Sequence, residues 1–236
     1  MDAKYEGIAV TPRNGKAVEI NSLWYNALKI MEELAKEFEG KEISNRYAKL
    51  ASKAKKSFNE KFYNEKKKCL YDVIGDEKIR PNQLFSMSLT YPVLDLASNI
   101  AEEVFNTVTK KLLNKYGLKT LAKGEENYVE IYEGSPFKRD MSYHQGITWP
   151  WLLGIYYDSY KNKIKVTKDK AKKQELQDEL KKFIGSVKKT FEKDFYQRGM
   201  VGSISELYDS KAPYLQKGTM AQGWSVAEVF RIMLEK

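Results

Sequence analysis

Apolar residues recur at helical spacing along most of the chain, and this periodicity limits the fold more than any other feature. Between residues 18 and 38 they fall three or four positions apart, which places them on one stripe of a helix. That stripe comprises Ile20, Leu23, Trp24, Ala27, Leu28, Met31, Leu34, Ala35 and Phe38, and Gly40 is expected to end the helix. The same spacing predicts helices at about 42–63, 82–91, 95–116, 147–162, 168–195 and 219–235, with Gly117 ending the fourth of the seven. About seven helices and few strand patterns indicate an all-α protein.

Four longer segments connect these helices, at 1–17, 64–81, 118–145 and 196–218. They hold most of the glycines and many aromatic residues that stand beside polar ones. Helices in series with long loops favour a helical toroid, in which the loops build a site on a rigid scaffold. We find no Pro/Gly linker and no low-complexity stretch, so we predict a single domain over residues 1–236.

The residue inventory excludes several kinds of site. One histidine, His144, and one cysteine, Cys69, are too few for a His/Cys zinc centre, and no serine lies in a G-x-S-x-G motif. We find no phosphate-binding glycine loop, so we expect neither a metal nor a cofactor. A single cysteine indicates a reducing compartment, which favours a cytoplasmic location. No apolar run approaches the eighteen residues of a membrane span.

The net charge of +9 raises the alternative of a basic helical protein that binds nucleic acid. The lysines are interleaved with acidic residues along predicted helices, and arginines are few, so solvated helix faces explain the charge better. We therefore expect no nucleic-acid partner. Nucleic-acid binding that weakens steeply with salt would favour the nucleic-acid hypothesis. Binding of maltooligosaccharides that does not depend on salt would favour a carbohydrate site.

Carboxylates in aromatic-rich loops remain as the candidate chemistry. Glu206 stands in such a loop, in the stretch SISELYD at 203–209, just before the last predicted helix. Aromatic rings stack on the apolar faces of pyranose rings, and two carboxyl groups can split a glycosidic bond as acid and base. This pattern suggests sugar cleavage, although structural loops can share the same composition.

Six blocks of the sequence resemble, in order, the glycogen-debranching enzyme family, specifically its C-terminal amylo-α-1,6-glucosidase domain. The blocks are MDAKYEGIAVTPRNGKAVEINSLWYNAL, RPNQLFSMSL, GLKTLA, YHQGITWPWLLGIY, ISELYD and AQGWSVAEVFR. The resemblance implies an (α/α)6 toroid of the six-hairpin type. It also implies hydrolysis of α-1,6-linked glucose stubs in glycogen or limit dextrin, with inversion of configuration.

Carried over by position, the resemblance makes Asp2 the general acid and Glu206 the general base. An inverting pair stands roughly 6.5–9.5 Å apart, which leaves room for a water molecule. The resemblance further implies that sugar is bound or the pocket shaped by Arg13, Glu19, Asn82, Gln83, His144, Gln145, Trp149, Trp151 and Trp224.

Several of these residues also have a structural interpretation. Glu19 could cap a helix N-terminus, and Arg13 could pair with a buried carboxylate. Trp151 and Trp224 lie near helical stripes, which favours core positions over sugar contacts. His144 is expected to hydrogen-bond in the pocket and not to act as acid or base, because two carboxylates already fill those roles.

A toroid of six helix pairs needs more helices than the seven predicted, so we expect the C-terminal part of such a domain. Apolar helix flanks without neighbours should then drive self-association or require a partner chain that supplies the missing helices. The amino terminus beside Asp2 favours the ionised carboxylate, the opposite of what a general acid needs. We therefore expect this chain alone to hydrolyse weakly or not at all. A glucoamylase-like α-glucosidase acting on other linkages, or a non-catalytic carbohydrate-binding remnant, stays an alternative.

Overall fold

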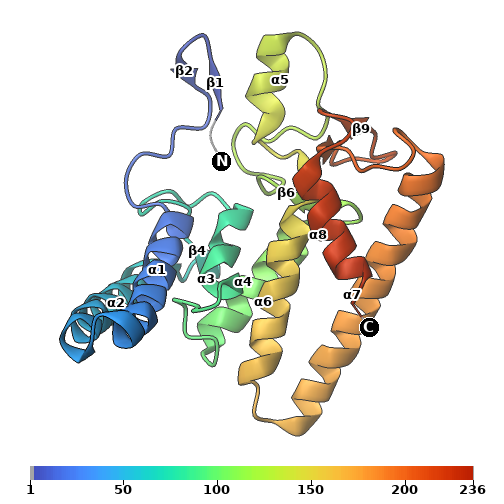
Figure 1. The fold of residues 1–236 in the computed structure, drawn as a ribbon. Coiled ribbons are helices and arrows are strands. Elements are labelled where there is room, and N and C mark those ends of the chain that lie inside the picture. Colours follow the sequence, from blue (N-terminus) through green and yellow to red (C-terminus); the bar gives the residue numbers. More distant parts are fainter. Residues whose placement is uncertain (1–2, 236) are drawn as a thin grey trace.

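The computed structural model describes residues 3–235, and helices make up most of it (Figure 1). In the described residues the α-helices are α1 (Val18–Phe38), α2 (Lys41–Lys61), α3 (Phe85–Ser88), α4 (Asn99–Lys111), α5 (Pro136–Tyr143), α6 (Leu152–Val166), α7 (Lys170–Gln197) and α8 (Gly223–Met233), and a 3-10 helix η1 (Pro81–Leu84) leads into α3. No helix among residues 3–235 combines the length and apolar character needed to cross a lipid bilayer.

The long helices occur where the apolar periodicity predicts them, within a few residues at each end for α1, α2, α7 and α8. Two predicted helices have different bounds. The helix expected at 95–116 covers only Asn99–Lys111, and the one expected at 147–162 begins at Leu152. The short helix α5 lies inside the segment 118–145, which we predicted to be a loop.

Short strands were not predicted, and they correct the all-α expectation. Antiparallel pairs join β1 (Lys4–Tyr5) to β2 (Ile8–Ala9) and β3 (Tyr63–Asn64) to β4 (Cys69–Leu70). A five-stranded antiparallel sheet follows chain order, with β5 (Leu113–Asn114), β6 (Gly117–Lys119), β7 (Thr148–Trp149), β8 (Leu207–Tyr208) and β9 (Gln216–Lys217). This sheet matters for the site because it brings three loops together that are far apart in the sequence.

Gly117 has a different role from the helix stop that we predicted. Helix α4 already ends at Lys111, and Gly117 lies in β6 with a φ of +155°. A Cβ atom at this position would lie 2.3 Å from the backbone oxygen of Trp149 in the neighbouring strand. Only glycine therefore allows β6 to approach β7 so closely.

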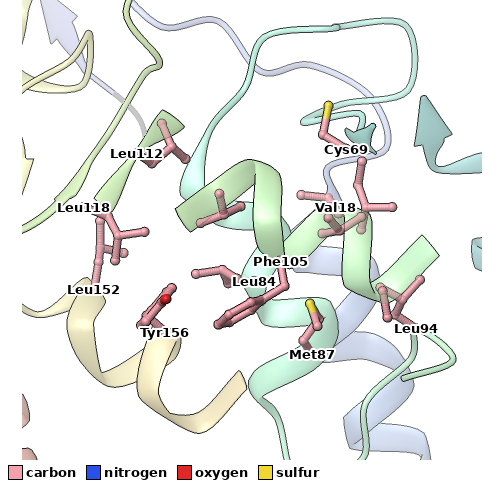
Figure 2. Close-up of a cluster of buried hydrophobic side chains, with 14 of the residues drawn as sticks. Val18, Cys69, Leu84, Met87, Leu94, Phe105, Leu112, Leu118, Leu152 and Tyr156 are labelled. Carbon is pink, nitrogen blue, oxygen red and sulfur yellow. The ribbon is translucent and has the colours of Figure 1, made fainter. Parts of the chain in front are cut away.

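The main core lies where α1, α3, α4 and α6 meet, and Figure 2 shows part of it. Val18, Met87, Phe105 and Tyr156 are buried there. A second cluster packs α7 and α8 against the five-stranded sheet, around Tyr116, Phe191 and Tyr208. These two clusters fix the loops that carry the candidate site.

The apolar stripe of α1 is only partly buried. The face that packs inward carries Val18, Tyr25, Leu28 and Ala35. Much of the predicted stripe is instead exposed, namely Ile20, Leu23, Trp24, Met31, Leu34 and Phe38.

The toroid prediction agrees with this architecture in part. The pairs α1–α2 and α6–α7 are antiparallel hairpins, as in a six-hairpin fold (Figure 1). A complete ring of six pairs has twelve helices, and residues 3–235 form only eight α-helices.

Candidate active site

A pocket of about 660 Å³ opens where α1, α6 and α8 begin. Its size lies in the range of small-molecule sites. The walls come from widely separated segments and comprise Glu19, Ile20, Asn82, Phe85, Thr120, Tyr143, His144, Trp149, Trp151, Leu152, Glu206, Gln222 and Trp224. Seven of the predicted site residues are in this set, so the fold gathers them around one cavity.

Glu206 occupies one wall, directly before β8. The residue is buried, with only 8% of its surface exposed. Its Oε1 accepts hydrogen bonds from the Tyr143 hydroxyl at 2.5 Å and from the Gln222 side-chain amide at 3.3 Å. Its Oε2 accepts from the backbone N–H of Thr219 at 3.0 Å. All three neighbours donate, as an ionised carboxylate requires, because its oxygens can only accept.

Gly218 makes this arrangement possible. It adopts a φ of +68°, in the left-handed region, and a Cβ there would lie 2.3 Å from Oε2 of Glu206. The segment after β9 can therefore pass beside the carboxylate and present the Thr219 amide to it only with glycine at this position.

The loop that carries Glu206 is anchored to α7 through Asp194, which is buried. Asp194 accepts hydrogen bonds from the hydroxyl of Tyr208 at 2.8 Å and the side-chain amide of Gln216 at 3.0 Å, and it pairs with Arg198 at 3.2 Å. Buried carboxylates are stable when their oxygens are satisfied in this way. The network therefore fixes two neighbouring strands to α7: β8, which directly follows Glu206, and its partner β9.

The opposite side of the pocket rests on a second buried charge network. Arg13 donates to Glu19 at 2.7 Å and to Asp72 at 2.6 Å, and Asn82 donates to Asp72 at 2.8 Å. Burial raises the pKa of Asp72, and the Arg13 guanidinium opposes this rise. Arg13 and Asp72 stand behind the wall, where they orient the Glu19 carboxylate and the Asn82 amide that line the cavity.

Gln83 and Gln145 also stand behind the wall. Arg80 donates to the side-chain oxygen of Gln145 at 2.8 Å and to the backbone oxygen of His144 at 2.6 Å. Gln83 donates to the Arg80 carbonyl at 2.8 Å and accepts from the backbone of Leu70 at 3.0 Å. Their contacts fix the loop that carries His144, and they do not reach the cavity.

Aromatic side chains form the remaining walls. Trp149 is buried, stacks on His144 with ring centroids 5.2 Å apart, and donates its Nε1–H to the Tyr143 carbonyl at 3.2 Å. Trp151 and Trp224 stack on each other with centroids 5.3 Å apart. The prediction that Trp224 belongs to the core is wrong, because 49% of it is exposed at the pocket rim.

His144 is held neutral. Burial lowers its pKa to about 3, and the nearby charges of Arg80 and Arg13 act in the same direction. Its Nδ1 is buried without a hydrogen-bond partner among the described residues. A neutral imidazole can shape the pocket or contact a hydroxyl group, and it carries no positive charge near neutral pH.

Asp2, the other predicted catalytic residue, lies outside the described residues. Sequence reasoning missed four residues that support the site: Tyr143, Gln222, Asp72 and Arg80. Tyr143, Gln222 and Arg80 lie inside the quoted motifs YHQGITWPWLLGIY, AQGWSVAEVFR and RPNQLFSMSL, so the motifs contained the signal for these three residues. Over the part of the chain that the structure describes, no group of three or more His, Cys, Asp or Glu side chains could hold a metal ion.

Both the fold and the sequence of this chain match known proteins. Among solved structures, a chain described as a sialidase superposes with a TM-score of 0.70 at 14% sequence identity. The match covers 95% of this chain but only 20% of the sialidase chain, so it shows a shared fold over a fifth of that protein. The family model described as amylo-alpha-1,6-glucosidase matches residues 1–231. The chain therefore belongs to the amylo-alpha-1,6-glucosidase family, a family of glycoside hydrolases.

Proposed function

We propose that this chain forms the site that hydrolyses α-1,6-linked glucose stubs of glycogen or limit dextrin by an inverting, two-carboxylate mechanism. The observation that carries the proposal is the Glu206 carboxylate, which three donors hold at the wall of an aromatic pocket. Family membership supplies the substrate class. The aromatic rims of Trp151 and Trp224 suit the apolar face of a glucosyl ring, and Glu19 and Asn82 suit its hydroxyls.

In this mechanism Glu206 removes a proton from a water molecule as the water oxygen attacks the anomeric carbon. The bond between that carbon and the glycosidic oxygen breaks, and the general acid gives its proton to the leaving oxygen. We assign the acid role to Asp2. The products are β-glucose and the trimmed α-glucan. Tyr143 and Gln222 keep the Glu206 carboxylate from rotating, so that its accepting oxygen stays directed at the water.

The experiment is to measure β-glucose release from a branched limit dextrin by the unmodified chain and by Glu206→Gln. We use enzyme at micromolar concentration, because we expect slow turnover. Glu206→Gln keeps the shape of the side chain but cannot accept a proton, so release should fall by about 10²–10⁴-fold. Asp2→Asn should cause a comparable loss, and substitution of the exposed Glu37 on α1 should cause none.

Three results would contradict the proposal. Equal rates for the unmodified chain and Glu206→Gln would exclude this residue as the base. Release of α-glucose would exclude inversion. Faster hydrolysis of linear maltooligosaccharides than of the branched substrate would indicate a glucoamylase-like enzyme for other linkages.

A further inference from the structure

Helix α1 leaves a regular apolar face open to solvent. Six residues of this face follow one another at alternating intervals of four and three positions, namely Ile20, Trp24, Ala27, Met31, Leu34 and Phe38. All six are exposed, whereas Leu28 and Ala35 on the neighbouring strip of the same helix are buried. We call these six residues the heptad face. It extends for about 27 Å along the helix, and the hairpin of α1 and α2 lies at one edge of the molecule (Figure 1).

The spacing of the heptad face is that of a two-helix coiled coil. Alternating steps of four and three keep one stripe turned towards a partner helix, because a supercoiled helix has about 3.5 residues per turn. The six positions are also symmetric about residue 29, so a second copy of α1 that runs in the opposite direction would pair Ile20 with Phe38, Trp24 with Leu34, and Ala27 with Met31. Each pair joins a larger side chain to a smaller one, which lets facing layers interdigitate.

The two ends of the heptad face carry opposite charge. Residues 33–42, at the end of α1 and the start of α2, include four glutamates and two lysines. At the other end, a groove of about 290 Å³ lies between α1 and α2 beside Trp24. The described residues that line this groove include no acidic side chain and three lysines, Lys16, Lys53 and Lys61. Antiparallel helices place the acidic end of each copy against the basic groove of the other, whereas parallel helices place like charges together.

We propose that the heptad face joins two copies of this chain in a symmetric antiparallel dimer. The interface is isologous, because each copy contributes the same six residues, one acidic end and one basic groove. The dimer goes beyond the proposed function, yet it reaches the candidate active site. Ile20 lines the pocket, so its pairing brings Phe38 of the second copy to the rim of that pocket. Each active site thereby gains an aromatic side chain from the other copy.

Disulfide cross-linking tests the direction of the two helices. The natural Cys69 is buried, so the unmodified protein should give no linked dimer under mild oxidation. Ile20→Cys and Phe38→Cys should each give none alone, because the two copies of either residue lie at opposite ends of the interface, about 27 Å apart. A mixture of the two variants should give a linked dimer on a non-reducing gel. A linked dimer from Phe38→Cys alone, or none from the mixture, would overturn the inference.

Charge exchange tests the pairing of the ends. Glu37→Lys with Glu39→Lys should raise the Kd of the dimer about tenfold, and so should Lys53→Glu with Lys61→Glu. The chain with all four substitutions should regain the Kd of the unmodified protein, because its ends are complementary again. All four side chains are exposed, so the fold should not change, and circular dichroism verifies this. Sedimentation equilibrium measures each Kd.

The matched control is Lys181→Glu with Lys189→Glu. These two lysines are exposed on α7, and the substitution changes the net charge as much as the exchange of Lys53 and Lys61 does. The control should leave Kd unchanged. Failure of the fourfold variant to regain affinity would overturn the inference, as would a monomer throughout the micromolar range, which would assign the heptad face to a different protein. None of these measurements depends on hydrolysis, so failure of the proposed activity would leave the dimer standing.

Discussion

Glu206 depends on three donors that come from distant parts of the chain. The Tyr143 hydroxyl lies at the end of α5, the Thr219 amide follows β9, and Gln222 precedes α8. The aromatic-rich loop and the block ISELYD were enough to predict Glu206 as a site residue. They could not predict which side chains would contact it, because those contacts are made only when the sheet aligns the loops.

The first prediction concerns the shortest of these contacts. Tyr143→Phe removes the hydroxyl that donates to Oε1 of Glu206 but keeps the ring against Trp149. A hydrogen bond to a charged group contributes about 1.5–3 kcal/mol, so kcat for limit dextrin should fall about tenfold or more, with little change in KM. Steady-state kinetics provide the measurement.

The matched control is Tyr132→Phe. The Tyr132 ring lies 5.8 Å from that of Tyr143, and its hydroxyl does not bond to Glu206. Its kcat should stay near that of the unmodified protein. If both variants lose the same activity, Tyr143 acts through general packing and not through its hydroxyl.

The second prediction concerns pH. Because the pKa of His144 is lowered to about 3, from an ordinary value near 6.5, the unfolded chain binds a proton between these values that the folded chain does not. The free energy of unfolding therefore decreases as the pH falls below about 6.5. From pH 7 to pH 5 this one group should remove about 1–2 kcal/mol.

His144→Phe keeps a ring stacked on Trp149 but cannot titrate. Urea unfolding of both proteins at pH 7 and pH 5 isolates the effect, because the carboxylates titrate alike in each. The variant should lose less stability than the unmodified protein over this range. An equal loss would show that His144 is accessible to protons in the folded state.

At the scale of elements, periodicity predicts long helices well and short strands poorly. Helix α7 (Lys170–Gln197) presents many turns of the pattern, whereas each strand of the five-stranded sheet has only two or three residues. A strand that short cannot display the alternation by which strands are detected. Helix α4 was predicted too long for a related reason, since Leu112 and Leu113 continue its apolar pattern into a β-hairpin.

Two glycines give opposite predictions for the same substitution. Gly185 is exposed in the middle of α7, and a Cβ there would meet no atom within 4 Å. Gly185→Ala should raise the free energy of unfolding by about 0.5–1 kcal/mol. Gly117→Ala should lower it by about 1–3 kcal/mol, because the methyl group would displace the Trp149 backbone. Chemical denaturation measures both, and a stabilised Gly117→Ala would contradict the close approach of β6 and β7.

At the scale of the whole molecule, the pocket exists only because the fold brings the first turn of α1 and the first turn of α8 to one cavity, together with segments from the middle of the chain. Its walls extend from Glu19 on α1 to Trp224 on α8. The sequence could indicate that loops build a site, and the quoted motifs could indicate most of its residues. It could not separate those that reach the cavity from those behind it, such as Gln83 and Gln145, because that distinction depends on tertiary packing.

The exposed stripe of α1 leads to a prediction about assembly. Phe38 is 73% exposed, and Leu34, Met31 and Trp24 continue the apolar surface along the helix. Patches of this kind drive association, so we expect the chain to self-associate at micromolar concentration. Sedimentation velocity should show species that dissociate in the double variant Leu34→Lys, Phe38→Lys. Leu234→Lys, which removes an exposed leucine at the end of α8, should not dissociate them. A monodisperse monomer in the unmodified protein would refute this expectation.

The concentration of indole rings at the pocket has a practical consequence. Three of the four tryptophans, Trp149, Trp151 and Trp224, line one cavity, and two of them stack face to face. Emission from these rings should respond to whatever enters the cavity, while Trp24 on α1 provides a background that does not. Intrinsic tryptophan fluorescence should therefore report when a ligand occupies the cavity, without a label or a turnover assay.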